Sequence, residues 1–340
     1  MKMTRREMSA FLMYRMPRPQ ETHTLKEYFP NRIPIHNSTE LEEYLSERVK
    51  ATAGSKTALA LSGGIDSAIL AKFMPKGSVA YTFKCIVPNV QVTDETPAAS
   101  KYAKECGLEH RIIEVYWEDF EQYTDVLMKR KKAPIHSIEV QILKAALQAK
   151  KDGIERIIYG ESADAVYGGL SNILSKDWKI GDFIERYSYV MPYAVLKDFE
   201  LPIEPITELE KNGFIDPHYF ISNVFIQESV ASYLNASAIA GIDVVLPYAE
   251  TFLDTDMDYS RIRSGENKYL VREVFKRLYP SFPIPPKTPM PRPMNEWMKD
   301  WKGPTRPEFW PHCIDGMSGD QKWLVWALER FLNLQAKEEI

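Results

Sequence analysis

A short segment rich in serine and glycine, Ser62-Gly63-Gly64-Ile65-Asp66-Ser67, has the composition of a phosphate-binding turn. Glycines lack a Cβ atom, so the backbone can curl until successive N–H groups point at one anion, and a helix that begins there adds its positive end. The hydroxyls of Ser62 and Ser67 are further hydrogen-bond donors. The sequence therefore predicts that an anion such as a phosphate binds at the turn formed by Leu61, Ser62, Gly63, Gly64, Asp66 and Ser67.

A second segment with polar and glycine residues is Gly160-Glu161-Ser162-Ala163-Asp164. Each segment follows a short apolar run that reads as a strand. In an open α/β sheet, ligands bind beyond the carboxyl ends of the strands, so we expect both segments to face one crevice. The first segment lacks the Gly-Lys-Ser/Thr of a Walker A loop and is not GxGxxG, so neither kinase-type phosphate binding nor dinucleotide binding is predicted.

The elements that position these segments alternate between β-branched runs and helical periodicity from Thr57 to about Gly169. This alternation is typical of a parallel sheet with crossover helices. The predicted strands are Ala58–Leu61, Val79–Phe83, Arg111–Val115 and Arg156–Tyr159. The predicted helices are Asp66–Phe73, Asp94–Cys106 with Thr93 as N-cap and Gly107 beyond its end, and Ile138–Lys151 closed by Gly153. The expected fold class is α/β, an open parallel sheet with flanking helices.

Beyond Gly169 the pattern becomes mainly helical, as in Tyr219–Ala240 and Lys268–Leu278. Prolines recur through residues 280–311, which excludes a regular helix or central strand and predicts an extended segment. A last helix is expected from about Asp320 to Leu334. We therefore divide the chain into an N-terminal segment 1–50, a nucleotide-binding α/β region 51–200 and a mainly helical part 201–340.

Composition excludes several classes of protein. With 340 residues and 44% hydrophobic content, the chain can bury one large core or two moderate ones. A net charge of −4 and a pI near 6.0 give no overall attraction to nucleic acid or to anionic membranes, so neither is predicted as a partner. The three cysteines show no disulfide or zinc pattern, which fits a reducing cytoplasm best.

At these residues the chain resembles a known family. The first segment resembles the PP-loop of the N-type ATP pyrophosphatases, a fold related to the adenine nucleotide α-hydrolases. The second, continued to Gly169, resembles the Gly-Glu-Gly-x-Asp-Glu-x-Phe-Gly-Gly element of asparagine synthetases and β-lactam synthetases. Gly265–Arg272 and Pro285-Pro286-Lys287 resemble that family's Gly-Lys-x-x-Leu-Arg helix and the lysine after it. Residues 11–25 are similar to the connector before the synthetase domain, so we expect residues 1–50 to be connector-like and the amidotransferase domain to be absent.

The resemblance implies that ATP is cut between its α and β phosphates, with Mg²⁺ held by Asp66 and Asp164. It places Gly160 at the nucleotide and Glu161 beside an acyl-adenylate, where a carboxylate can accept a proton from an incoming amine. Lys287 is expected to stabilise the charge that grows on the phosphates. The implied function is an AMP-forming ligase that joins a small-molecule carboxylate to ammonia or an amine. The ammonia is free or comes from a separate glutaminase chain.

Three departures from the family pattern bear on the substrate. Ala165 replaces a glutamate, and Val245 replaces an arginine that would pair with a carboxylate, so aspartate is not expected as the substrate. A different stretch, His136-Ser137-Ile138-Glu139, stands where the family has small hydroxyl residues. Possible substrate contacts are therefore His136, Glu139 and Tyr248.

Some assignments stay open. Lys268 and Arg272 are spaced i, i+4, which suits a solvated helix face as well as a site. A related enzyme class uses the same loop to thiolate RNA, and predicts a basic face and reactive cysteines that the sequence does not show. A non-catalytic nucleotide-binding module is the other alternative. Ala165 supports that module, whereas Asp66, Asp164 and Lys287 favour an enzyme.

Overall fold

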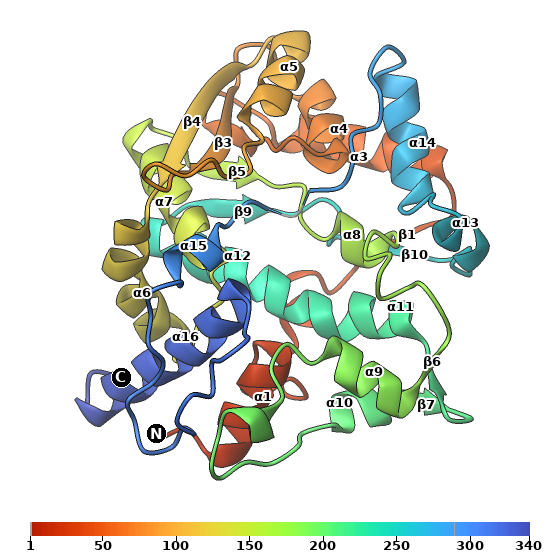
Figure 1. Cartoon of the computed structure of the whole chain (residues 1–340). Coiled ribbons are helices and arrows are strands. Elements are labelled where there is room, and N and C mark those ends of the chain that lie inside the picture. Colours follow the sequence, from red (N-terminus) through yellow and green to blue (C-terminus); the bar gives the residue numbers. More distant parts are fainter. Residues whose placement is uncertain (1, 289) are drawn as a thin grey trace.

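The computed structural model describes residues 2–288 and 290–340, so residue 1 and position 289 of the predicted proline-rich segment lie outside it. Its centre is a five-stranded parallel sheet in the order β4-β3-β2-β5-β9 (Figure 1). The strands are β4 (Glu109–Val115), β3 (Val79–Cys85), β2 (Thr57–Ala60), β5 (Arg156–Ile158) and β9 (Asp243–Val245). The strand order reverses between β2 and β5, and such a reversal is where open α/β sheets bind ligands.

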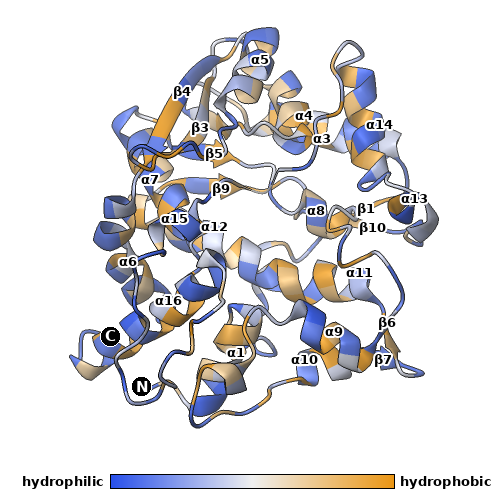
Figure 2. Cartoon of the chain, viewed as in Figure 1, coloured by the Kyte–Doolittle hydropathy of each residue, from blue (hydrophilic) through white to orange (hydrophobic). Residues whose placement is uncertain are grey.

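Helices cover both faces of the sheet. Right-handed crossovers place α4 and α5 on one face and α7 on the other, because the chain moves in opposite directions from β2 and from β4. Hydrophobic residues gather on the strands and on the helix faces turned toward them (Figure 2). The covering helices are α3 (Ser38–Thr52), α4 (Ile65–Phe73), α5 (Thr96–Cys106), α6 (Trp117–Lys131), α7 (Ile138–Lys151), α12 (Ile226–Ala240) and α14 (Tyr269–Leu278).

The predicted open parallel sheet is confirmed, with three differences in detail. The helix expected from Asp94 with Thr93 as N-cap instead begins at Thr96, because the Asp94 carboxylate accepts hydrogen bonds from the Thr96 backbone and hydroxyl. The helix expected over Tyr219–Ala240 is divided into a short α-helix, a π-helical turn and α12. The fifth strand, β9, was not predicted.

Below the sheet in Figure 1, helices from both ends of the chain pack together. Helix α1 (Arg5–Tyr14) begins with a Thr4 capping box and contacts α16 (Gly319–Ala336). The N-terminal segment is tied in further by β1 (Ile33–Ile35), which pairs in parallel with β10 (Thr251–Leu253). These contacts bring residues that are far apart in the sequence next to one another in the structure.

The remaining elements are short, and they include a three-stranded antiparallel sheet in the order β6-β8-β7. They are α2 (Thr24–Tyr28), α8 (Ala163–Val166), β6 (Trp178–Lys179), α9 (Ile180–Tyr187), η1 (Pro192–Ala194), α10 (Glu204–Thr207), β7 (Glu210–Lys211), β8 (Phe214–Ile215), α11 (Pro217–Phe220), η2 (Ile221–Phe225), α13 (Tyr259–Arg263) and α15 (Met294–Trp297). Within the described ranges, no helix combines the length and apolar character needed to cross a bilayer.

Candidate active site

The serine- and glycine-rich turn lies between β2 and the start of α4. The Ser62 backbone N–H donates to Ser67 Oγ at 2.9 Å, and the Gly64 N–H donates to Ser62 Oγ at 3.1 Å. Gly64 is the N-cap of α4, and no side chain of the described residues caps this end. The N-terminal N–H groups of a nine-residue helix therefore remain available to an anion.

The second motif packs directly against this turn. A Cβ atom on Gly160 would lie 2.9 Å from the Ser67 backbone nitrogen, a distance that real Cβ atoms do not reach. Likewise, a Cβ atom on Gly169 would lie 1.9 Å from Asp164 Oδ1. Only glycine fits at either position without displacing the backbone or the carboxylate. The two glycines therefore allow the motifs after β2 and β5 to meet.

Lys268 joins the two aspartates of these motifs. Its Nζ lies 2.8 and 2.7 Å from the carboxylate oxygens of Asp66 and 2.9 Å from Asp164 Oδ1. Lys287 contacts the other oxygen of Asp164, with Nζ 2.9 Å from Oδ2 and 2.9 Å from the Gly169 carbonyl. Lys268 was left open by its spacing, and the structure places it at the centre of the site. The Gly265–Arg272 motif was the signal that pointed to it.

The two carboxylates differ in acidity because their surroundings differ. Burial acts to raise the pKa of Asp164, but Lys268 and Lys287 outweigh it and lower that pKa to about 2. The pKa of Asp66 is raised, mainly by burial. The positive charge of Lys268 acts to lower this pKa, whereas the negative charge of Asp164 raises it further. The ammonium of Lys268 is held charged, since both aspartates raise its pKa against the effect of burial. The lysines thus neutralise the carboxylate pair.

The oxygen atoms of this pair suit a hard divalent cation. Mg²⁺ prefers oxygen ligands and is usually held by one or two carboxylates together with substrate phosphates and water. Oδ1 of Asp164 is buried and accepts no hydrogen bond from the residues that the structure describes, although Lys268 pairs with it ionically. The same residues contain no group of three or more His, Cys, Asp or Glu side chains that could hold a metal alone. Asp66 and Asp164 therefore fit a metal bound jointly with phosphates.

Two cavities meet at Asp66 and Asp164. One, of about 180 Å³, lies over the ends of β2, β3 and β5 and has aromatic walls, including Tyr81, Phe83 and Tyr233. The other, of about 260 Å³, is lined by Gly63, Gly64, Asp66, Asp164, Lys268, Arg272 and Lys287. The first suits a flat base and ribose, and the second, with its N–H groups and cations, suits phosphates. Sequence reasoning missed the aromatic walls, because strand residues such as Tyr81 read as core.

Two further carboxylates border these cavities. Glu161 accepts a hydrogen bond from Ser229 Oγ at 2.7 Å, and burial raises its pKa. Glu95, which was not predicted, lines both cavities, and burial raises its pKa to about 7 although the Gly63 N–H opposes this. A carboxylate with a raised pKa exchanges protons nearer neutral pH than usual, as acid–base catalysis requires.

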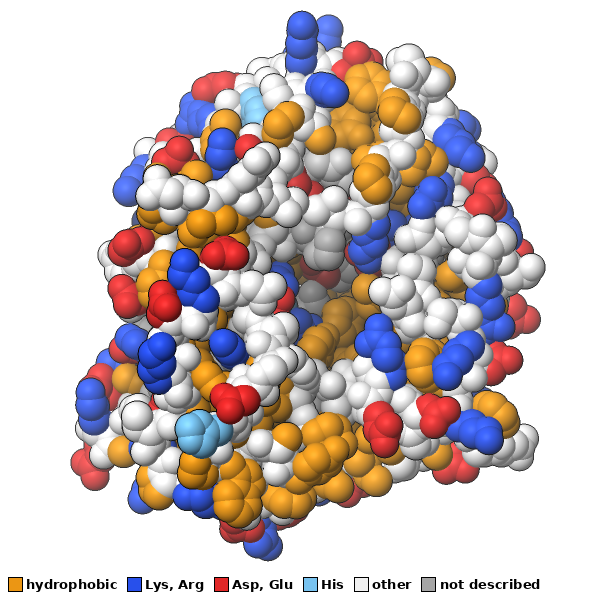
Figure 3. Space-filling model, viewed as in Figure 1, with side chains coloured by type: hydrophobic (Ala, Val, Ile, Leu, Met, Phe, Trp, Pro, Cys, Tyr) orange, Lys and Arg blue, Asp and Glu red, His pale blue; other side chains and the backbone are white. Residues whose placement is uncertain are grey.

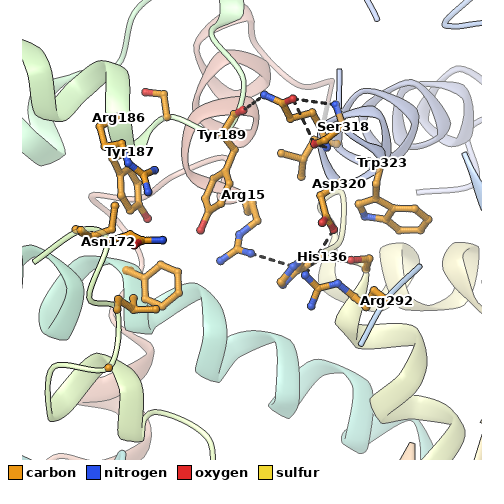
Figure 4. Close-up of a pocket in the computed structure, with 18 of the residues that line it drawn as sticks. Arg15, His136, Asn172, Arg186, Tyr187, Tyr189, Arg292, Ser318, Asp320 and Trp323 are labelled. Atoms are coloured by element: carbon orange, nitrogen blue, oxygen red, sulfur yellow. Dashed lines mark hydrogen bonds and ion pairs between the residues drawn. The ribbon is translucent and has the colours of Figure 1, made fainter. Parts of the chain in front are cut away.

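A third and larger cavity, of about 810 Å³, adjoins the phosphate cavity at Lys287. Figure 3 shows a hollow near the middle of this face of the molecule. His136 lines the large cavity (Figure 4) and receives a hydrogen bond from Arg15. Burial is the main cause that holds the pKa of His136 well below its usual value. The positive charges of Arg15, Arg292 and Lys131 lower the pKa further, so the ring is neutral.

The structure does not bring the other two expected substrate contacts to these cavities. Glu139 is fully buried and is bound by Lys131 and Asn235. Tyr248 is also fully buried, and its hydroxyl donates to the Asp66 carbonyl at 3.1 Å, so it supports the turn from behind. Val245, at the position of the family's arginine, lies in β9 with its carbonyl bonded to the Tyr159 N–H. None of these three side chains lines the cavities, and Tyr248 supports the site through its bond to Asp66.

Comparison with solved structures returns proteins of low sequence identity and low TM-score. An ammonia-dependent NAD synthetase from Campylobacter jejuni is 18% identical over 38% of this chain, with a TM-score of 0.25, and the match spans 58% of that synthetase. An NMN synthetase from Francisella tularensis is 15% identical over 78% of this chain and 100% of its own, with a TM-score of 0.27. The tRNA thiolase NcsA from Methanococcus maripaludis is 16% identical over 72% of this chain and 82% of its own, with a TM-score of 0.24.

Comparison with curated protein sequences returns no significant match. The family model described as asparagine synthase, in contrast, matches residues 40–220, which is more than half of the chain. The matched range contains the turn after β2 and the motif after β5, whose aspartates share Lys268. The chain therefore belongs to the asparagine synthase family, whose members are ATP-utilising enzymes of the ligase type.

Proposed function

We propose that this chain is an AMP-forming, amide-forming ligase that adenylates a carboxylate and transfers the acyl group to ammonia or an amine. The observation that carries the proposal is the position of Lys268 between Asp66 and Asp164, with Lys287 on the same Asp164. This cluster lies where a cavity with aromatic walls meets a cavity lined by N–H groups and cations. A nucleoside triphosphate has the matching distribution of apolar and anionic groups.

In the first step, an oxygen of the substrate carboxylate attacks the α-phosphorus of ATP, and the bond to the bridging oxygen of pyrophosphate breaks. The turn from Ser62 to Ser67 holds the leaving pyrophosphate through its N–H and hydroxyl groups. Lys287 stabilises the negative charge that moves onto the phosphates. Asp66 and Asp164 would hold Mg²⁺ together with the phosphates, and the bound ion would supply further positive charge to offset the charge of the leaving group.

In the second step, an amine nitrogen attacks the acyl carbon, and the bond between that carbon and the AMP oxygen breaks. The nitrogen must lose a proton as the amide forms. Glu161 borders the nucleotide cavity, and its raised pKa suits a carboxylate that accepts this proton. The products are then AMP, pyrophosphate and an amide.

Incubation of the purified protein with ATP, Mg²⁺, ammonium and a panel of carboxylic acids tests this function. Acid-dependent release of AMP and pyrophosphate is expected, and release of ADP and phosphate would contradict it. Lys287→Ala should abolish AMP formation while ATP affinity stays largely intact. Lys299→Ala, at an exposed lysine outside the three cavities, is the matched control. Equal loss in both variants would show that Lys287 has no special part.

Several further features belong to the same proposal. We infer a cytoplasmic enzyme that takes ammonia from solution or from a separate glutaminase chain. We also retain the division into 1–50, 51–200 and 201–340, with β9 from the last range completing the sheet. The RNA-modifying alternative predicts a basic face, and the net charge of −4 does not favour it. A non-catalytic module predicts ATP binding without AMP release in the same assay.

A further inference from the structure

The cavity of about 810 Å³ is built from segments that span almost the whole chain. Its lining includes Arg15 from the end of α1, His136 before α7, Tyr187 at the end of α9, and Arg292 (Figure 4). Lys287 lines this cavity and the phosphate cavity alike. A molecule in the large cavity would therefore lie next to the cations that surround the phosphates of ATP.

Polar atoms without partners gather in the wall of this cavity. Arg15, His136 and Tyr187 are 8%, 7% and 6% exposed, so water reaches them little. Several buried polar atoms of these residues, and of Ser137 and Arg292, make no hydrogen bond within residues 2–288 and 290–340. They are Arg15 Nε, His136 Nδ1, Ser137 Oγ, Tyr187 Oη and Arg292 Nε. An unsatisfied buried polar atom costs free energy, so a ligand or water that reaches these atoms and pairs with them is stabilised there.

The unsatisfied atoms are predominantly donors. An arginine Nε–H can only donate a hydrogen bond. Nη1 of Arg15 donates to His136 Nε2, so the single proton of this neutral ring is on Nδ1, a donor that lies 3.7 Å from Glu228 Oε1, beyond hydrogen-bond distance. The hydroxyls of Ser137 and Tyr187 can donate too. The wall therefore calls for a ligand rich in acceptor oxygens.

Charge in the cavity favours an anion over an ammonium group. Arg15 is neutralised by Glu228 at 2.9 Å, and Lys287 by Asp164 at 2.9 Å. Arg186 has neither a hydrogen bond nor an ion pair in the described part of the chain. Arg292 reaches its partner Asp320 only at 3.5 Å.

Asp320 is the acidic residue in the cavity lining, and its side chain is 60% exposed. Two guanidinium groups are thus free or nearly free to bind an oxyanion.

Size and apolar walls complete the description of the ligand. A volume of about 810 Å³ lies within the range that accommodates drug-sized ligands. It exceeds what an amino acid as small as aspartate would fill. The aromatic rings of Tyr189, Phe225 and Trp323 line the same space. The ligand should therefore combine an apolar body with oxyanion groups.

We propose that this cavity holds the acid substrate, and that this acid carries a second oxyanion, a carboxylate or a phosphate, bound by Arg186 and Arg292. The carboxylate that becomes adenylated lies at the Lys287 end, and the second oxyanion lies toward the arginines. The identification of the ligand as the substrate rests on the proposed ligase function. The preference of the cavity for an acceptor-rich dianion rests on the geometry alone.

Binding without ATP tests the preference for a dianion. Isothermal titration calorimetry would compare 3-phenylpropanoate with its para-carboxy, para-phosphono and para-aminomethyl derivatives. At least one dianion should bind about tenfold more tightly than the monoanion, and the ammonium derivative more weakly than either. The relative affinities of the carboxy and phosphono derivatives show which oxyanion the cavity prefers.

Arg186→Gln should remove most of this preference, and Arg186→Lys should retain part of it. Arg186 is exposed on α9, so neither variant threatens folding. Arg156→Gln, at a partly exposed arginine of β5 outside the cavity, should leave the preference unchanged.

Three results would overturn the assignment. They are failure of both dianions to bind, equal affinity for monoanion and dianion, and a preference that survives in Arg186→Gln. The proposed function is tested separately by AMP release, so the two can fail independently. Dianion binding without AMP release in any assay would leave the dianion preference of the cavity standing and reject the ligase, together with the identification of the ligand as its substrate. AMP release with a monoacid, unaffected by Arg186→Gln, would instead support the ligase and reject the dianion preference of the cavity.

Discussion

Nη1 of Arg15 lies 2.9 Å from Nε2 of His136, and both side chains are buried. Because a guanidinium has no acceptor, Nε2 of the histidine must accept this hydrogen bond. The lone pair that a general base would use is therefore occupied. The sequence left His136 as a possible substrate contact, whereas this hydrogen bond leaves the proton of a neutral ring on Nδ1, which lies 3.7 Å from Glu228 Oε1.

Substitution of His136 tests this role. His136→Gln can still offer an acceptor to Arg15, whereas His136→Leu leaves a buried N–H unsatisfied. Urea unfolding should show a loss of about 1–3 kcal/mol for His136→Leu and a smaller loss for His136→Gln. The pH dependence of AMP formation should keep its shape in His136→Gln. Disappearance of one limb of that profile would instead show that His136 titrates in the reaction.

Removal of Lys268 should destabilise the free protein. Lys268 is 6% exposed and is paired with both Asp66 and Asp164. Lys268→Met leaves two adjacent carboxylates without this cation. The free energy of unfolding should fall by an amount on the order of 3 kcal/mol. This loss is at the lower end of the range for breaking a buried ion pair, because Asp164 is partly exposed. Thermal unfolding should show the loss, and added Mg²⁺ should restore more stability to Lys268→Met than to the wild type.

Lys287→Met is the control for that experiment, since the Lys287 side chain is 32% exposed and pairs only with Asp164 among the described carboxylates. A smaller loss of stability is expected there. If Mg²⁺ stabilised all three proteins equally, the two aspartates would not form the proposed metal site.

Gly160→Ala should push the motif after β5 away from the turn between β2 and α4. The added methyl would lie 2.9 Å from the Ser67 backbone nitrogen, so the turn or the strand end must move. Overpacking of this kind costs about 1–3 kcal/mol, and the displaced N–H groups should weaken ATP binding. Calorimetry with ATP and urea unfolding measure the two effects.

Gly181→Ala is a suitable control, because no described atom lies within 4 Å of its added methyl. It lies inside α9, where alanine favours the helix by about 0.5–1 kcal/mol over glycine. Unchanged ATP affinity in both variants would show that the close approach of the motifs does not matter for binding.

Glu95 should make stability depend on pH. Burial raises its pKa from 4.5 to about 7 in the folded chain, whereas the unfolded chain releases the proton near 4.5. Between these values the folded state binds more protons, so the free energy of unfolding falls as pH rises through this window. Glu95→Gln lacks the titrating group and should gain stability relative to the wild type between pH 4.5 and pH 7.

Urea unfolding of both proteins at pH 4 and pH 8 measures this difference. Glu185→Gln, at an exposed position of α9, should show no such change. A constant difference between Glu95→Gln and the wild type at both pH values would contradict the raised pKa.

Local features of the sequence were enough to predict much of the fold. The turn from Ser62 to Ser67 depends on glycine geometry and on an apolar strand before it, and both can be read within a few residues. The helix Ile138–Lys151 was predicted with the observed bounds, because its apolar period and closing glycine are local too. In contrast, β9 has three residues and is a strand only through its parallel pairing with β5.

The site divides in the same way. The sequence determined the identity of Asp66, Asp164 and Lys287 as phosphate-site candidates, because motif residues keep their spacing within one loop. Only the tertiary structure decided that Lys268 faces both aspartates, and that Glu139 lies in the core with its charge already paired. The direction of a side chain depends on contacts with residues far away in the chain. Such contacts have no fixed spacing in the sequence, so no local pattern can encode them.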